Sequence, residues 1–196
     1  MVLNATNLAA RSARLVRLLD FITRAVRVPF VGTRPGHFMK GIFMLAKTLK
    51  EFLDQRKVKY VTISHSPAYT AHEVAESAHV SGRILAKTVM TVIDGALAMA
   101  VLPSNHRVVL DDLRELAETE DVRLAREEEF KHFFPDCEPG AMPPFGYLYD
   151  MSTYVSPLLA EESEIAFNAG SHTEIIKMSW RDYDRLVMPR VANFTT

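Results

Sequence analysis

The sequence predicts an α+β fold: a single domain with a central mixed, curved, barrel-like β-sheet flanked by short helices. Residues 83–91 form a run that is mostly apolar on both alternating faces, as expected for an interior strand. The dipeptide Asp94-Gly95, a common hairpin turn, joins this run to a second apolar run at 96–102, so we expect a central antiparallel pair. Irregular alternation of short strands and short helices elsewhere favours α+β over a doubly wound nucleotide-binding sheet.

The composition indicates one soluble globular domain with an appendage. The chain has 196 residues, of which 48% are hydrophobic and 24% charged, a balance typical of a folded soluble protein. No apolar run reaches the roughly 18 residues that span a bilayer, so we expect no membrane partner. The single cysteine, Cys137, excludes an internal disulfide framework and favours a reducing compartment, which we take to be the cytoplasm.

Residues 1–43 are predicted to be an extension. They carry a net charge of +6, which leaves −7 for residues 44–196. An acidic body argues against a protein that coats nucleic acid such as DNA non-specifically, although a small local basic patch would still fit. A basic amphipathic helix over 8–28 would suit a transit peptide, a membrane-surface helix or an RNA-binding arm. We instead expect residues 1–43 to be a loosely attached, disordered tail or to lie upstream of the true start, and residues 44–196 to form the domain.

Capping boxes mark the start of the first helices. Thr48 with Glu51, and Thr70 with Glu73, have the S/T-x-x-E spacing in which two side chains cap each other's backbone amides. The first predicted elements, in order, are a helix over 48–57, a strand over 59–65, a helix over 71–80 and the strands at 83–91 and 96–102.

The second half of the chain is expected to contain smaller elements. Ser179 and Asp182 form another N-terminal cap, and the helix that follows turns Trp180, Tyr183, Leu186 and Val187 inward or half inward. The predicted elements, in order, are a strand over 107–110, helices over 111–118 and 123–133, a Pro- and Gly-rich loop over 135–146, strands over 147–150, 164–169 and 174–178, and the final helix.

Lys87 is the first candidate for chemistry. Strand alternation places it on one face with Leu85 and Val89, inside a run that is otherwise mostly apolar. A lone ammonium there is costly unless its face opens onto an anionic or carbonyl-bearing ligand. A structural alternative is that Lys87 reaches a sheet edge or pairs with a carboxylate.

Familiar catalytic signatures are missing. The chain has no phosphate-binding P-loop, no dinucleotide-binding glycine motif and no serine-hydrolase elbow. His72 and His79 are seven residues apart, which excludes a zinc-protease helix, and we expect neither a metal nor a cofactor. Two stretches remain: the stiff loop at 140–146 and the polar strand end at 168–173, although a plain connection and a hydrogen-bonded turn would explain them as well.

Taken together, these features resemble a known family. A lysine in the central strand at A-K-T, a G-x-x-x-P loop at Gly140 to Pro144 and a strand ending in N-A-G-S-H occur in this order over residues 60–187. This set is similar to the YbaK family of aminoacyl-tRNA deacylases, relatives of the editing domain inserted in bacterial prolyl-tRNA synthetases. The resemblance implies hydrolysis in trans of the ester on a mischarged tRNA, with Lys87, Gly140 and Pro144 as the functional residues.

The resemblance also implies where a substrate is bound. Lys87 would supply positive charge to the ester oxygen or the terminal phosphate, and the loop backbone would hold the amino acid. We expect a small amino acid, alanine first and cysteine or serine next, on tRNA(Pro) or a related tRNA. The expected substrate-binding residues are Met142, Phe145, Gly146, His172, Ile63 and Val89, and the expected contacts to the tRNA acceptor end are Arg83, Arg107, Lys131 and Lys177.

Two other functions remain open from the sequence. The chain would also suit a non-catalytic module that binds aminoacyl-tRNA or an amino-acid-like ligand. Alternatively, it would act as a structural or regulatory partner of a synthetase, with the basic N-terminal helix as its docking element.

Overall fold

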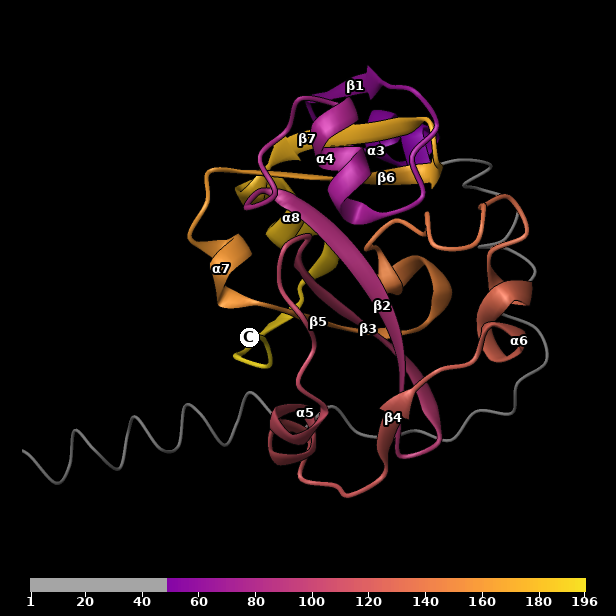
Figure 1. Ribbon diagram of the computed structural model, residues 1–196, viewed down its shortest axis with the longest axis vertical. Coiled ribbons are helices and arrows are strands. Elements are labelled where there is room, and N and C mark those ends of the chain that lie inside the picture. Colours follow the sequence, from indigo (N-terminus) through magenta and orange to yellow (C-terminus); the bar gives the residue numbers. More distant parts are fainter. Residues whose placement is uncertain (1–48) are drawn as a thin grey trace, which may run out of the picture. The chain divides into compact units, whose positions relative to one another are not determined.

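The computed structural model describes residues 49–196 and contains one mixed, curved β-sheet. Its strands follow the order β1-β7-β6-β2-β3-β5-β8, and β4 pairs with the far part of β2. In Figure 1, β2 and β3 form a long pair, and β1, β7 and β6 lie across one end of it. The predicted α+β class is therefore confirmed. The strands are β1 Tyr60–Ser64, β2 Leu85–Ile93, β3 Ala96–Pro103, β4 Val122–Leu124, β5 Ser152–Val155, β6 Glu164–Ser171, β7 Glu174–Ser179 and β8 Arg190–Val191.

The predicted central hairpin is present. Strands β2 and β3 pair antiparallel from Ile93 opposite Ala96 to Ala86 opposite Pro103. Asp94 and Gly95 both have positive φ angles, 49° and 73°, as a two-residue turn of this twist requires. On its other side, β2 pairs with the parallel strand β6, so the strand that carries Lys87 is central.

The capping signals within the described residues also hold. The Thr70 side chain accepts a hydrogen bond from the Glu73 amide, and the Glu73 carboxylate accepts one from the Thr70 amide. The Ser179 hydroxyl likewise accepts from the Asp182 amide at 3.1 Å. The helices are α3 Leu49–Gln55, α4 Ala71–Ser77, α5 Leu110–Ala117, α6 Glu127–Phe130, α7 Pro157–Ala160 and α8 Trp180–Val187, with 3₁₀ turns η1 Lys131–Phe133 and η2 Gly146–Tyr149. Among these helices, none is long and apolar enough to cross a bilayer.

Three predicted elements are wrong. Residues 107–110 form no strand, because only Val108 makes a bridge, to Thr195. The helix over 123–133 is reduced to α6, because residues 122–124 add to the sheet beside β2 and Val122 is buried there. Residues 147–150 lie mostly in the turn η2, and the strand begins only at Ser152. The short helix α7 had no sequence prediction.

Predictions for the N-terminal extension lie outside the described residues. This applies to the basic helix over 8–28, to the domain boundary at residues 43 and 44, and to Thr48 of the first capping box. Only the part of that first helix from Leu49 onward is described, as α3.

Two faces of the sheet are covered by different helices. On one face, α8 packs through Tyr183, Leu186 and Val187 into the main core, as predicted, while Trp180 is half-buried at its edge. On the other face, Val74 and Ala78 of α4 pack in a small cluster with Leu85, Ala166 and Ile175 from three neighbouring strands. Lys87 lies on this second face of the sheet.

Candidate functional site

A small hollow lies where α4, β2, β6 and the loop at 140–146 meet. It holds about 40 Å³ of solvent space, enough for roughly three water molecules at 10–15 Å³ each. Lys87 and Gly140 are among the residues that line it. The lining residues are Tyr69, Thr70, Val74, Leu85, Ala86, Lys87, Gly140 and Asn168.

The sheet register explains why Lys87 and Asn168 share this hollow. Leu85 on β2 lies opposite Ala166 on β6, and the two strands run parallel. Alternate residues of a strand point to the same face, so Lys87 faces the side of Leu85 and Asn168 faces the side of Ala166. A bulge follows Asn168 in β6. The two side chains therefore come from adjacent strands, although they are far apart in the sequence.

Lys87 has no carboxylate partner within residues 49–196. Its ammonium donates a hydrogen bond to the Ser104 carbonyl oxygen at 3.1 Å, and none of the ion pairs in this part of the chain includes it. Burial, and secondarily the positive charge of Arg107, lowers the pKa of Lys87 below that of an exposed lysine. The ammonium is thus half-buried and uncompensated, and it retains donors for a ligand.

The loop that carries Gly140 is fixed to the end of β6. The Glu138 amide donates to the Gly170 carbonyl at 2.8 Å, and the Gly170 amide donates to the Ala141 carbonyl at 3.1 Å. Gly140 has a φ of +86°, a conformation that side chains with a Cβ avoid. The predicted stiff loop is therefore held by backbone pairing on both sides of Gly140.

His172 is hydrogen-bonded to this loop through both its ring and its backbone. Its Nε2–H donates to the Pro139 carbonyl at 2.9 Å, and its backbone amide donates to the Glu138 carboxylate at 2.5 Å. Its ring also lies 4.9 Å from the ring of Tyr69, which is 75% exposed. His172 therefore stands at the rim of the hollow, and its Nε2 is engaged by the loop.

Pro144 and Gly146 attach the far end of the loop to the core. The buried Tyr183 hydroxyl donates to the Pro144 carbonyl at 2.9 Å. At Gly146, a Cβ would collide with the Thr153 hydroxyl and the Met151 carbonyl, so a glycine is needed there for close packing. Both residues position the loop, and neither lines the hollow.

The predicted pocket walls lie elsewhere. Met142 and Phe145 are buried in the main core, where the Phe145 ring contacts Phe167 and Tyr183. Val89 packs against the cluster near α5, and Ile63 packs against the cluster under α4. None of these four side chains lines the hollow.

The four predicted tRNA contacts are also dispersed. Arg83 pairs with Glu162 at 2.9 Å, and Lys177 pairs with Glu164 at 3.1 Å. Lys131 is exposed on the 3₁₀ turn η1. Of the four, Arg107 is the one whose positive charge helps to lower the pKa of Lys87, after burial.

Several lining residues had no prediction as site residues, and Asn168 is the clearest. Its Oδ1 atom is buried and has no hydrogen-bond partner in the described part of the chain. A polar amide in the otherwise apolar run Ile165 to Ala169 was a signal that the sequence offered. Tyr69 and Thr70 precede α4, and their place beside β2 depends on how that helix packs.

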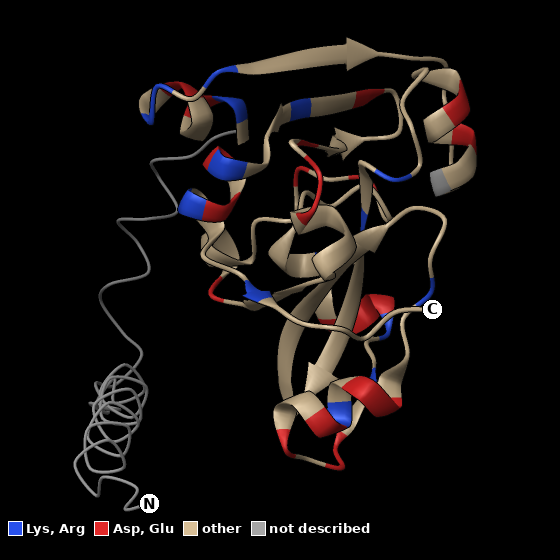
Figure 2. Cartoon of the chain, turned by 90° about the vertical axis from the view of Figure 1, so that its left-hand side faces the viewer, with Lys and Arg blue, Asp and Glu red and all other residues tan. Residues whose placement is uncertain are grey.

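A larger depression elsewhere does not have the charge expected of a tRNA site. It measures about 380 Å³ and lies along α5 and the loop that follows. Figure 2 shows acidic residues gathered on this helix and loop. Such a surface repels phosphates. It is lined by Asp111, Arg114, Glu115, Glu118, Thr119 and Glu120.

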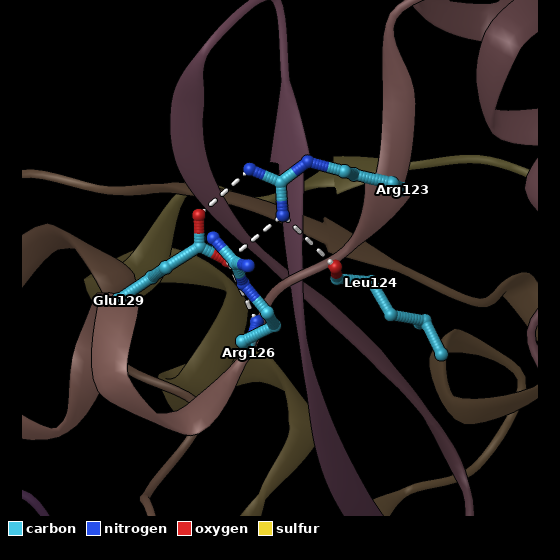
Figure 3. A network of polar contacts seen from close by, with 4 residues as sticks. All are labelled: Arg123, Leu124, Arg126 and Glu129. Atoms are coloured by element: carbon cyan, nitrogen blue, oxygen red, sulfur yellow. Dashed lines mark hydrogen bonds and ion pairs between the residues drawn. The ribbon is translucent and has the colours of Figure 1, made fainter.

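A second cluster of charges, next to β4, is fully paired. The Arg123 guanidinium donates to both oxygens of Glu129, at 2.7 and 2.8 Å, and to the Leu124 carbonyl at 3.2 Å (Figure 3). The Arg126 amide donates to the same carboxylate at 2.8 Å. These bonds, those from Arg123 first, lower the pKa of Glu129 from 4.5 to about 2. Residues 49–196 contain no cluster of side chains with the geometry of a metal site.

Comparisons with known proteins identify the family and the fold. A family model described as an aminoacyl-tRNA editing domain matches residues 65–186, more than half of the chain. A protein from Escherichia coli K12, the multifunctional Ser/Thr-tRNA deacylase ProXp-y, is 39% identical over 59 residues, which are 30% of this chain and 35% of that protein. The aligned stretch thus spans about a third of that relative's length.

Solved structures share the fold. The crystal structure of a hypothetical protein aligns with a TM-score of 0.68 at 23% identity, covering 76% of this chain and 99% of the other. A candidate trans-editing enzyme for prolyl-tRNA synthetase aligns with a TM-score of 0.63 at 20% identity, covering 74% and 92% of the two chains.

Proposed function

The chain belongs to the aminoacyl-tRNA editing domain family, and from this premise we propose that it hydrolyses, in trans, the ester that joins a wrong amino acid to a tRNA. The observation that carries the proposal is the uncompensated Lys87 ammonium in a small hollow opposite the Gly140 loop. A cation without a carboxylate partner is suited to a ligand that develops negative charge.

The residues that line the hollow suggest how the reaction proceeds. The lining contains no histidine, cysteine or carboxylate, so we propose that water attacks the ester carbonyl without a covalent enzyme intermediate. Lys87 stabilises the oxyanion that forms on the carbonyl oxygen, and the ribose oxygen leaves with a proton. An aminoacyl ester is already activated, so orientation and charge stabilisation provide the main acceleration.

The size of the hollow supports a small amino acid. About 40 Å³ of solvent space accommodates a methyl or hydroxymethyl side chain more readily than a prolyl ring. Val74, Leu85 and Ala86 supply apolar contacts, and Thr70 and Asn168 supply polar ones. We propose alanine first, with cysteine and serine next. Threonine joins the candidates because the Escherichia coli relative is named for serine and threonine.

The partner we propose is the acceptor end of a mischarged tRNA, tRNA(Pro) or a related one. The hollow is too small for a nucleoside, so the terminal adenosine would lie at the rim. There the exposed Tyr69 ring offers a surface on which a base can stack. We also propose association with a synthetase, suggested by the name of the structural relative, and a cytoplasmic location, which the single cysteine favours.

A deacylation panel tests the proposal. Full-length protein is incubated with tRNAs charged with alanine, serine, threonine, cysteine or proline, and the remaining aminoacyl-tRNA is measured over time. Wild type is expected to deacylate at least one small aminoacyl-tRNA, whereas Lys87→Ala does so at the uncatalysed rate. A wild-type protein that binds these tRNAs but cleaves none of them would instead be a non-catalytic binding module.

A further inference from the structure

One residue that lines the hollow, Asn168, has a side-chain oxygen without a partner in the described part of the chain. Asn168 Oδ1 is buried and accepts no hydrogen bond within residues 49–196. Leaving a buried acceptor unpaired is unfavourable, and such an atom in a binding site is typically satisfied by the ligand. His65 Nε2 and Thr153 Oγ1 are also buried without partners in this part of the chain, but neither residue lines the hollow.

Two residues that line the hollow therefore bring together an acceptor without a partner in residues 49–196 and an ammonium that keeps donors beyond its bond to Ser104. Asn168 Oδ1 accepts hydrogen bonds, and the Lys87 ammonium donates them. An alanyl ester carries the complementary pair, because its carbonyl oxygen accepts and its α-amino group is the only N–H donor of the aminoacyl moiety. Binding the carbonyl oxygen at Lys87 leaves the amino group to satisfy Asn168.

We propose that Asn168 Oδ1 accepts a hydrogen bond from the substrate's α-amino group, so that the site takes esters of free amino acids and rejects N-acylated and peptidyl esters. This inference rests on the proposed function and narrows its substrate class. Two effects act together: acylation removes the basic amine, and the added acyl group exceeds the space in a hollow of about 40 Å³. Nascent peptidyl-tRNA would thereby be spared.

Binding of a non-hydrolysable analogue tests the inference separately from catalysis. The probes are 3′-alanylamido-3′-deoxyadenosine and its N-acetyl derivative, titrated calorimetrically into the full-length chain. Wild type is expected to bind the free-amine probe at least about 10-fold more tightly. Asn168→Leu should weaken the free-amine probe by about 10- to 100-fold, as expected for a hydrogen bond to a charged group, and change the N-acetyl probe little.

Two variants serve as controls. Asn168→Asp keeps an acceptor at this position and should preserve the preference for the free amine. Thr153→Val removes another buried, unpartnered oxygen, one outside the hollow, and should leave both affinities unchanged.

The possible outcomes separate the two proposals. Equal affinity of wild type for both probes, or equal weakening of both by Asn168→Leu, would overturn the role of Asn168. Free-amine selectivity without any turnover of alanyl-tRNA would support Asn168 while rejecting the hydrolase. Turnover of N-acetyl-alanyl-tRNA at the rate of alanyl-tRNA would overturn the inference and retain the hydrolase.

Discussion

Two positively charged side chains, Lys87 on the central strand β2 and Arg123 on the neighbouring strand β4, have opposite surroundings. Arg123 lies in β4, which pairs with the C-terminal part of β2. Its guanidinium shares the Glu129 carboxylate with Arg126. Within residues 49–196, Lys87, in the N-terminal part of β2, donates to the Ser104 carbonyl, and its neighbouring charge is that of Arg107. The pKa of Glu129 falls because Arg123, and then the Arg126 amide, donate hydrogen bonds to it, whereas the pKa of Lys87 falls because burial and a like charge oppose its ionised form.

This difference separates a structural charge from a functional one. The Arg123–Glu129 pair is satisfied within the fold, where it holds α6 against β4 and needs no ligand. Within residues 49–196 Lys87 has a hydrogen bond but no counter-charge, and natural proteins usually tolerate such a cost where a ligand offsets it. We therefore expect substitutions at the two cations to affect different properties.

The largest expected effect is on turnover at Lys87. Lys87→Ala should lower the rate of deacylation by about 100- to 1,000-fold, the usual cost of removing one donor to an oxyanion. Arg123→Ala, at the paired cation, should change the rate by no more than about twofold. Both are measured with the same small aminoacyl-tRNA, and circular dichroism checks the fold. Equal losses of deacylation rate in Lys87→Ala and Arg123→Ala would contradict the distinction between a functional and a structural charge.

A second pair of variants compares two glycines of similar backbone conformation. Gly140 and Gly95 have φ angles of +86° and +73°, so an alanine at either position should cost about 1–2 kcal/mol of stability. Only Gly140→Ala should also lower activity, because only Gly140 lines the hollow. Urea unfolding and deacylation assays measure the two effects. If Gly95→Ala also lost activity, the loss of activity in Gly140→Ala would be explained by reduced stability alone.

A smaller effect concerns pH. Arg107→Gln removes a like charge that lowers the pKa of Lys87, so that pKa should rise while remaining below normal because of burial. Since the reaction needs the protonated ammonium, the alkaline fall in kcat/KM should move to higher pH. The profile is measured with a minimal aminoacyl ester and corrected for spontaneous hydrolysis. If the alkaline fall moved to lower pH instead, Arg107 would not be a cause of the lowered pKa of Lys87.

The smallest effect is expected at the paired cluster. Glu129 has a pKa of about 2 in the folded chain against 4.5 ordinarily, so its contribution to stability is fully present above pH 4.5 and is lost as the pH falls through about 2. Glu129→Gln should therefore be slightly less stable than wild type at neutral pH and equally stable at the acidic limit. Unfolding curves across this range, at low and high salt, measure the difference, which added salt should reduce.

Local patterns predicted the elements whose signals are short-range. The Asp94-Gly95 turn, the Thr70 and Ser179 caps and the alternation around Lys87 each involve residues a few positions apart, and all are present in the structure. The helix predicted over 123–133 was wrong because pairing of β4 with β2 outweighed local helix preference. Whether such a segment forms a helix or a strand thus depends on a partner strand that lies far away along the chain.

By itself, the sequence determined the α+β class, the central strand with its buried lysine and the family to which the chain belongs. Only the tertiary structure decided that Asn168 and Tyr69 meet Lys87 in one hollow, and that Phe145 and Met142 lie in the core. The physical reason is the parallel pairing of β2 with β6, which joins residues about 80 positions apart. The sequence marked residues 168–173 as a polar strand end, but which strand they lie beside depends on packing across the whole sheet.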